Sequence, residues 1–145
     1  MSDDIKEKLE EQHRAIDEAV RQTEVILASG IENSFRDLKL QVSALHKLVS
    51  INFNHEESIG KLEEVLEEFP RLTNLFDRFN KEHGELINEL ERLQNTAAEL
   101  SSFTGSRIQS LREDFDTFKV KLESHESREF EAIQEAYTTD ISQAD

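Results

Sequence analysis

The sequence predicts an all-α fold, an antiparallel up-down-up-down four-helix bundle. Residues that break helices are scarce, with one proline and four glycines among 145 residues. Charged residues make up 34% of the chain, and they alternate with aliphatic and phenylalanine residues at the three- and four-residue spacing of amphipathic helices. Turn-forming residues interrupt this pattern in three places, so the chain divides into four helical segments.

The predicted helices span residues of about 2–28, 34–67, 70–99 and 106–137. Ser34 and Asp37 form a start for the second helix that resembles a capping box. Pro70 suits the first turn of the third helix, where its missing N–H costs no hydrogen bond. A chain of this length is expected to form one domain, here over residues 1–137, and the polar residues 138–145 are expected to form a frayed tail.

Each predicted helix carries an apolar stripe that would face the core. In chain order, the stripes are Ile5, Leu9, Ile16, Val20 and Leu27; Phe35, Leu38, Val42, Leu45, Val49, Ile59 and Leu62; Leu72, Leu75, Phe76, Phe79, Leu86, Leu90 and Leu93; and Ile108, Leu111, Phe115, Phe118, Leu122, Ile133 and Tyr137. Four stripes joined by short turns are typical of a bundle in which each helix runs opposite to the one before it.

Polar residues interrupt every stripe near its middle, at positions where the helical period calls for an apolar side chain. They are His13 in the first helix, Asn52 and Glu56 in the second, His83 in the third, and His125 and Glu129 in the fourth. Taken alone, each has a simpler interpretation. His13 can be a core or boundary histidine, Glu56 a solvated charge in an acidic run, and Glu129 a charge that points out between helices.

The heights of these interruptions along the bundle predict that they meet. Two residues on neighbouring antiparallel helices are level when the turn lies midway between them in the sequence. The midpoint of His13 and the Asn52/Glu56 pair falls in the predicted turn at 29–34. The next two midpoints fall at Phe69–Pro70 and at Gly105, which are also turn signals. The polar residues are therefore expected to form one layer of the bundle.

Such a layer suits a metal ion. Buried carboxylates are destabilising unless they are paired, and no lysine or arginine lies on the stripes at this level. Imidazole nitrogens and carboxylate oxygens without sulfur favour iron or manganese, and zinc less specifically. Two glutamates from different helices could bridge two ions, while each histidine binds one of them.

The four polar segments also resemble the hemerythrin-like (HHE cation-binding) family over nearly the whole chain. The segments are Glu-Gln-His-Arg-Ala-Ile around His13, Asn-Phe-Asn-His-Glu-Glu at 52–57, Lys-Glu-His-Gly-Glu-Leu around His83 and Leu-Glu-Ser-His-Glu-Ser-Arg-Glu at 122–129. The resemblance implies a hemerythrin-like bundle with a non-haem iron centre, commonly diiron, that binds, senses or handles dioxygen, nitric oxide, peroxide or iron. It implies the metal ligands His13, Glu56, His83, His125 and Glu129.

Asn52 departs from the family pattern, because it stands where a histidine ligand is expected. An amide oxygen is a poorer iron ligand than imidazole, so the departure bears on whether one metal, two metals or none are bound. His55, one turn further along, is a candidate substitute although it lies off the apolar stripe. A metal-free bundle that serves as an interaction or scaffold module is the alternative function.

The composition of the chain excludes several classes of partner and reaction. A formal net charge of −15 disfavours nucleic acid and anionic membranes as partners. The absence of cysteine excludes disulfides, thiolate nucleophiles and iron–sulfur clusters. No Ser/His/Asp arrangement or His-Glu-x-x-His motif points to a hydrolase, so a binding or sensing role is expected, with peroxide chemistry as the enzymatic option. No signal peptide or membrane span is recognisable, and the expectation is a cytoplasmic monomer or homodimer.

Overall fold

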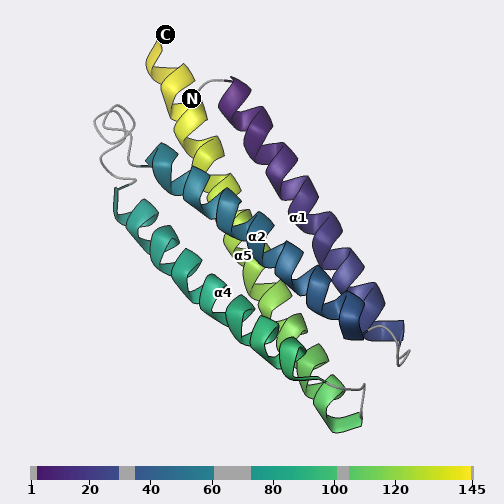
Figure 1. The fold of residues 1–145 in the computed structure, drawn as a ribbon. Helices are drawn as coiled ribbons and strands as arrows, with labels where there is room; N and C mark the ends of the chain where they lie inside the picture. Colours follow the sequence, from purple (N-terminus) through teal and green to yellow (C-terminus); the bar gives the residue numbers. More distant parts are fainter. Residues whose placement is uncertain (1–2, 30–34, 61–72, 101–104, 145) are drawn as a thin grey trace.

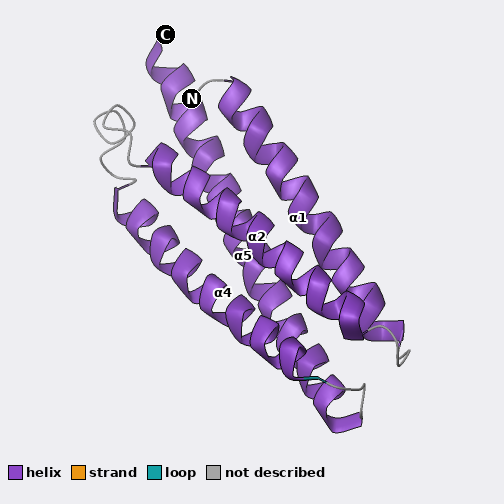
Figure 2. Ribbon diagram, viewed as in Figure 1, coloured by secondary structure: helices purple, strands orange, loops and turns teal. Residues whose placement is uncertain are grey.

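The structure is a computed structural model that describes residues 3–29, 35–60, 73–100 and 105–144. Four α-helices account for all of these residues except Leu100. They are α1 (Asp3–Ser29), α2 (Phe35–Gly60), α4 (Thr73–Glu99) and α5 (Gly105–Ala144). No strand occurs in these described ranges (Figure 2), which confirms the predicted all-α class.

Successive helices run in opposite directions along the bundle (Figure 1). The beginning of α1 and the end of α5 therefore lie at the same end of the molecule. Helix α1 packs on α2, α2 on α4, and α4 on α5. The contact between α1 and α5 is much sparser than these three, so the bundle is loosest along that edge.

Most described helix boundaries lie within about one residue of the predicted ones, which is the usual uncertainty of a helix end. The predicted end of the second helix at 67 and the predicted start of the third at Pro70 lie outside the described residues. The prediction for the C-terminal tail was wrong, because α5 continues to Ala144. Residues 138–144 contain neither proline nor glycine, so no residue there breaks the helix.

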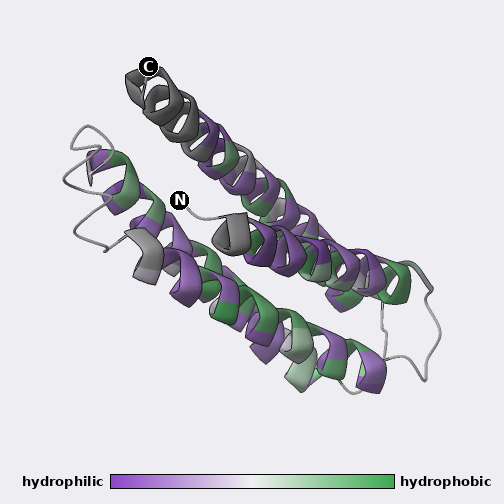
Figure 3. Cartoon of the chain, turned by 90° about the horizontal axis from the view of Figure 1, so that it is seen from above, coloured by the Kyte–Doolittle hydropathy of each residue, from purple (hydrophilic) through white to green (hydrophobic). Residues whose placement is uncertain are grey.

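The core consists of the predicted apolar stripes wherever the structure describes their side chains. The buried stripe residues are Leu9, Ile16, Val20, Leu27, Leu38, Val42, Leu45, Val49, Phe79, Leu86, Leu90, Leu93, Ile108, Leu111, Phe115, Phe118 and Leu122. Three further stripe residues are half-buried: Phe35, Leu75 and Phe76. The side chains of Ile5, Ile59, Leu62, Leu72, Ile133 and Tyr137 lie outside the described set. Hydrophobic and hydrophilic residues alternate around each helix (Figure 3), as an amphipathic bundle requires.

Within the described part of the chain, none of the helices has a stretch both long and apolar enough to span a bilayer.

Candidate metal centre

Four side chains from three helices meet in the middle of the bundle, and we call them the four-donor cluster. Glu56 comes from α2, His83 from α4, and His125 and Glu129 from α5. Each offers one nitrogen or oxygen atom, and these atoms all lie within 4.8 Å of one another. The cluster is shielded from solvent, since His83 is 3%, His125 1% and Glu129 7% exposed. The predicted polar layer therefore exists at this level of the bundle.

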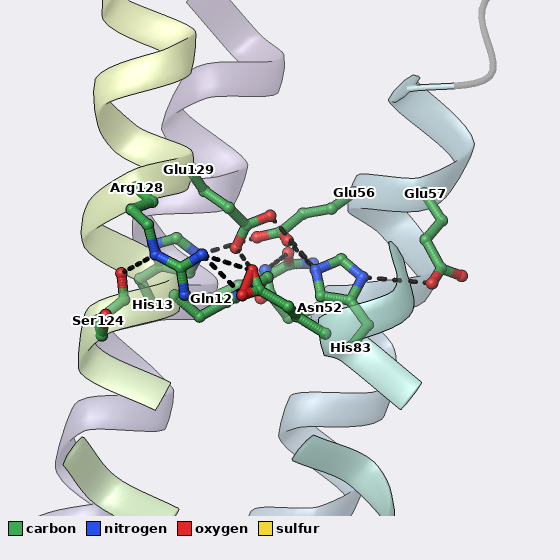
Figure 4. Close-up of polar contacts among 11 residues, drawn as sticks. Gln12, His13, Asn52, Glu56, Glu57, His83, Ser124, Arg128 and Glu129 are labelled. Carbon is green, nitrogen blue, oxygen red and sulfur yellow. Dashed lines mark hydrogen bonds and ion pairs between the residues drawn. The ribbon is translucent and has the colours of Figure 1, made fainter. Parts of the chain in front are cut away.

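Both histidines of the cluster turn Nε2 toward its carboxylates. His83 Nε2 lies 3.2 Å from Glu56 Oε2 and 3.3 Å from Glu129 Oε2. His125 Nε2 lies 2.8 Å from Glu129 Oε1, one helical turn along α5. Figure 4 shows Glu56, Glu129 and His83 pointing toward one another from their separate helices.

The outer nitrogen of each of these histidines contacts a second carboxylate. His83 Nδ1 lies 3.2 Å from Glu57 Oε1, on the far side of the ring from Glu129 (Figure 4). His125 Nδ1 lies 3.2 Å from Glu82 Oε1. When Nδ1–H donates to a carboxylate, the Nε2 lone pair is left for a metal, an arrangement that metal-binding histidines commonly adopt.

Arg128 holds the carboxylate of Glu82 in place, with Nη1 2.8 Å from Oε1 and 2.6 Å from Oε2. Burial alone would raise the pKa of Glu82, but the hydrogen bonds from Arg128 and His125 lower it. Sequence analysis missed Glu57 and Glu82 as parts of the site. Glu57 follows Glu56 and Glu82 precedes His83 in the sequence, and this was the one indication that they belong to the site. Acidic residues on the flank of a helix are usually solvated, so the indication was weak.

Two phenylalanines fix the planes of the histidine rings. Phe53 stacks on His83, with the ring centroids 3.9 Å apart and the planes 9° from parallel. Phe53 and Phe79 both present an edge contact to His125, at 5.6 Å and 5.5 Å between centroids. Both are 3% exposed, so they also exclude water from this side of the cluster.

His13 reaches the cluster from α1 through the second oxygen of Glu56. His13 Nε2 lies 3.0 Å from Glu56 Oε1, and its side chain is 27% exposed. Glu56 therefore uses its two oxygens for two histidines, His13 on α1 and His83 on α4. A carboxylate in this position has the connectivity of a ligand that bridges two ions.

The negative charges of the site raise the pKa values of His13 and His83. Burial would lower the pKa of His13, but its hydrogen bond to Glu56 and the charges of Glu126 and Glu129 raise it to about 9. Burial would likewise lower the pKa of His83, but its contacts with Glu129 and Glu56 raise it to about 10. For Glu129, the penalty of burial is outweighed by its close contacts with His125 and His83, so its pKa is lowered and the carboxylate is ionised.

Asn52 lies at the same level but is turned toward α1. It is completely buried, and its Nδ2 donates a hydrogen bond to Gln12 Oε1 at 2.8 Å. His55 also faces this residue, with Nδ1 3.4 Å from Gln12 Oε1. The structure thus places His55 against Gln12 and does not bring it into the four-donor cluster. Gln12 is a residue that sequence analysis missed.

Buried polar atoms that lack a hydrogen-bond partner show whether these residues fit a metal ion. Glu56 Oε2, His125 Nε2 and Glu129 Oε1 are buried and make no hydrogen bond to any described group. The last two are 2.8 Å apart, so the contact is close but the donor and acceptor are not aligned. Buried polar atoms are normally satisfied, and a cation at this point would satisfy all three. The donors therefore fit a metal ion bound by nitrogen and oxygen.

A comparison with protein families also indicates a cation-binding domain. The family model described as the hemerythrin HHE cation binding domain matches residues 4–136. This span contains His13, Glu56, His83, His125 and Glu129. Searches of curated proteins and of solved structures yield no match.

Proposed function

The chain belongs to the hemerythrin HHE cation-binding domain family, and from this premise we propose that it holds a non-haem iron centre with which it binds or senses a small molecule. The proposed ligands are Glu56, His83, His125 and Glu129, with His13 on the opposite oxygen of Glu56. The observation that carries the proposal is the convergence of buried donor atoms that make no hydrogen bond.

Iron is favoured by the donor set, which mixes imidazole nitrogen with carboxylate oxygen and contains no sulfur. When bound, iron would supply the capacity to bind dioxygen, nitric oxide or peroxide. The chain's own residues hold and orient the donors. Glu57 and Glu82 keep the Nδ1 protons of His83 and His125 in place, so both Nε2 atoms remain available.

The surroundings of the cluster limit what can reach it. Phe53 and Phe79 close one side with apolar rings. The partly exposed His13 is the most open member of the proposed ligand set. A ligand that enters from this side must be small and able to bind close to a carboxylate, which supports a diatomic molecule, peroxide or a metal ion.

A metal-free interaction or scaffold module is the second candidate, and two observations favour it. Asn52, at the position where a histidine ligand is expected, makes a hydrogen bond to Gln12 instead. The histidines and glutamates of the cluster also pair with one another, so part of their charge is compensated without a metal.

Elemental analysis separates these two functions. The protein would be purified without an affinity tag or chelator, as wild type and as the double variant His83→Ala/Glu129→Ala. A matched control is His46→Ala, because His46 lies on α2 but pairs with Glu91 at 3.3 Å, outside the cluster. The proposal expects stoichiometric iron in wild type and control and none in the double variant. A wild type without metal, and with a melting temperature indifferent to chelator, would support the scaffold.

The small-molecule role has its own test. The absorption spectrum of the iron-loaded protein is expected to change on addition of dioxygen, nitric oxide or azide. A spectrum that none of the three alters would contradict binding at the iron and leave storage or sensing of iron itself.

A further inference from the structure

A groove of about 690 Å³ runs between α1 and α5, along the loosest edge of the bundle. Its lining includes His13 and Val20 from α1 and Leu122, Glu126 and Phe130 from α5. Because His13 contacts Glu56, the groove reaches the metal-binding layer from the side. The four-donor cluster itself lies deeper, among α2, α4 and α5.

Glu126 stands where this groove meets the layer. It follows His125 directly and precedes Glu129 by one turn of α5. Its Oε1 atom is buried and makes no hydrogen bond to any described group. Glu126 is therefore a carboxylate that lines the same groove as His13 and has a buried oxygen without a hydrogen bond.

On α2, Asn52 also has a buried side-chain oxygen without a hydrogen-bond partner among the described groups. Its side chain is 0% exposed, and its Oδ1 atom makes no hydrogen bond, although its Nδ2 atom does. Asn52 lies one turn before Glu56 and faces α1 through Gln12, the neighbour of His13. Asn52 on α2 and Glu126 on α5 thus each carry a buried side-chain oxygen that makes no hydrogen bond to a described group.

We propose that Glu126 is a metal ligand which, with His13 and the Oε1 atom of Glu56, forms a second metal position beside the four-donor cluster. In this position Glu126 supplies the donor that was lost where Asn52 replaces the expected histidine. The inference rests on the proposed function, because it presumes that the four-donor cluster binds iron.

The two positions differ in chemistry. The four-donor cluster offers two imidazoles and two carboxylates. The second position offers one imidazole, from His13, with carboxylate oxygens from Glu56 and Glu126, so it is richer in oxygen and suits a harder cation. It also adjoins the α1–α5 groove, so an external ligand reaches this metal first. The second ion is accordingly expected to bind more weakly than the first.

Iron titration of four proteins tests the assignment, with bound iron per chain as the measurement. They are wild type, Glu126→Ala, the double variant Glu126→Ala/Asn52→His and the control Glu123→Ala. Glu123 lies on the same helix and lines the same groove but is exposed. Wild type and control are expected to bind about two irons per chain, and Glu126→Ala about one. Asn52→His should restore the second iron to the Glu126→Ala protein, because it returns an imidazole to the layer.

Far-UV circular dichroism establishes that each variant is folded before it is titrated. A Glu126→Ala protein that still takes up two irons with wild-type affinity would overturn the assignment, as would one that binds none. A wild type that binds a single iron, unaffected by Glu126→Ala, would overturn this inference but leave the proposed iron centre standing. A wild type that binds no iron would overturn both.

Discussion

At the scale of single residues, the site depends on how each buried histidine divides its two nitrogens. Nε2 faces the cluster, while Nδ1 of His83 faces Glu57 and Nδ1 of His125 faces Glu82. A neutral imidazole carries one proton, so a carboxylate that accepts the Nδ1 proton leaves Nε2 as a lone pair. Glu57 and Glu82 therefore orient the two histidines from outside the four-donor cluster.

Glu82→Gln is expected to weaken iron binding by about 10- to 100-fold, because the amide is a poorer acceptor for the Nδ1 proton of His125. Equilibrium titration against a competing chelator gives the affinity. Glu85→Gln is the matched control, since Glu85 is exposed on the same helix. Equal affinities for the two variants would show that the outer carboxylate does not support the site.

The residues that converge in this layer could be predicted from sequence because each one interrupts an apolar stripe. His13, Glu56, His83, His125 and Glu129 stand where the helical period demands a core residue, and their heights match. Glu57, Glu82 and Gln12 stand on helix flanks, where a polar residue is ordinary. Only the three-dimensional contacts distinguish such residues from solvated ones.

At the scale of elements, each helix performs two tasks, since one face forms the core and the middle of that face holds donors. In α2, Leu38, Val42, Leu45 and Val49 are buried in succession before Asn52 and Glu56. The apolar turns thus set the rotation of the helix that aims Glu56 inward. The apolar stripes predict this rotation, and the turn residues predict where the helices end. Three of the four helices were therefore predicted closely at their described ends.

The end of α5 was less predictable. Residues 138–144 are mostly polar and lack an apolar stripe, so packing gave no reason to extend the helix. No proline or glycine lies there to stop the helix, and it continues to Ala144.

Leu38→Ala is expected to destabilise the protein by about 2–5 kcal/mol, because it leaves a cavity under a side chain that is 0% exposed. Leu40→Ala on the same helix should change stability by less than about 0.5 kcal/mol, because Leu40 is 66% exposed. Urea unfolding monitored by circular dichroism measures both. A similar cost for both variants would mean that α2 is rotated differently.

At the scale of the whole molecule, the centre joins all four helices. Glu56 connects α2 to α1 through His13 and to α4 through His83, while Glu129 connects α5 to α4. A metal held by these side chains binds the folded chain and not the unfolded one, so it should raise stability. A net charge of −15 also favours the approach of cations over that of anions.

The metal-free protein is expected to lose stability as the pH rises through about 9 to 10. His13 and His83 have pKa values raised from 6.5 to about 9 and about 10, so their stabilising contribution is complete below pH 6.5 and is lost as they deprotonate. Glu129 has the opposite effect on the pH dependence of stability. Because its pKa is lowered, its ionised carboxylate stabilises the fold above pH 4.5, and this contribution is lost in acid.

Iron should reverse the alkaline trend, since metal-bound imidazoles are neutral and binding releases their protons. Between pH 6.5 and 9, the difference in melting temperature between loaded and metal-free protein is expected to widen. Differential scanning calorimetry under anaerobic conditions measures both forms. A metal-free melting temperature that rises through this range would contradict the raised histidine pKa values.

The most direct test of the central claim is an anomalous difference map, at the iron absorption edge, from a crystal of the iron-loaded protein. We predict a peak bound by Glu56, His83, His125 and Glu129, in the layer where their donor atoms lie within 4.8 Å of one another. A map without a peak there, with the histidines and glutamates paired only with one another, would contradict the account.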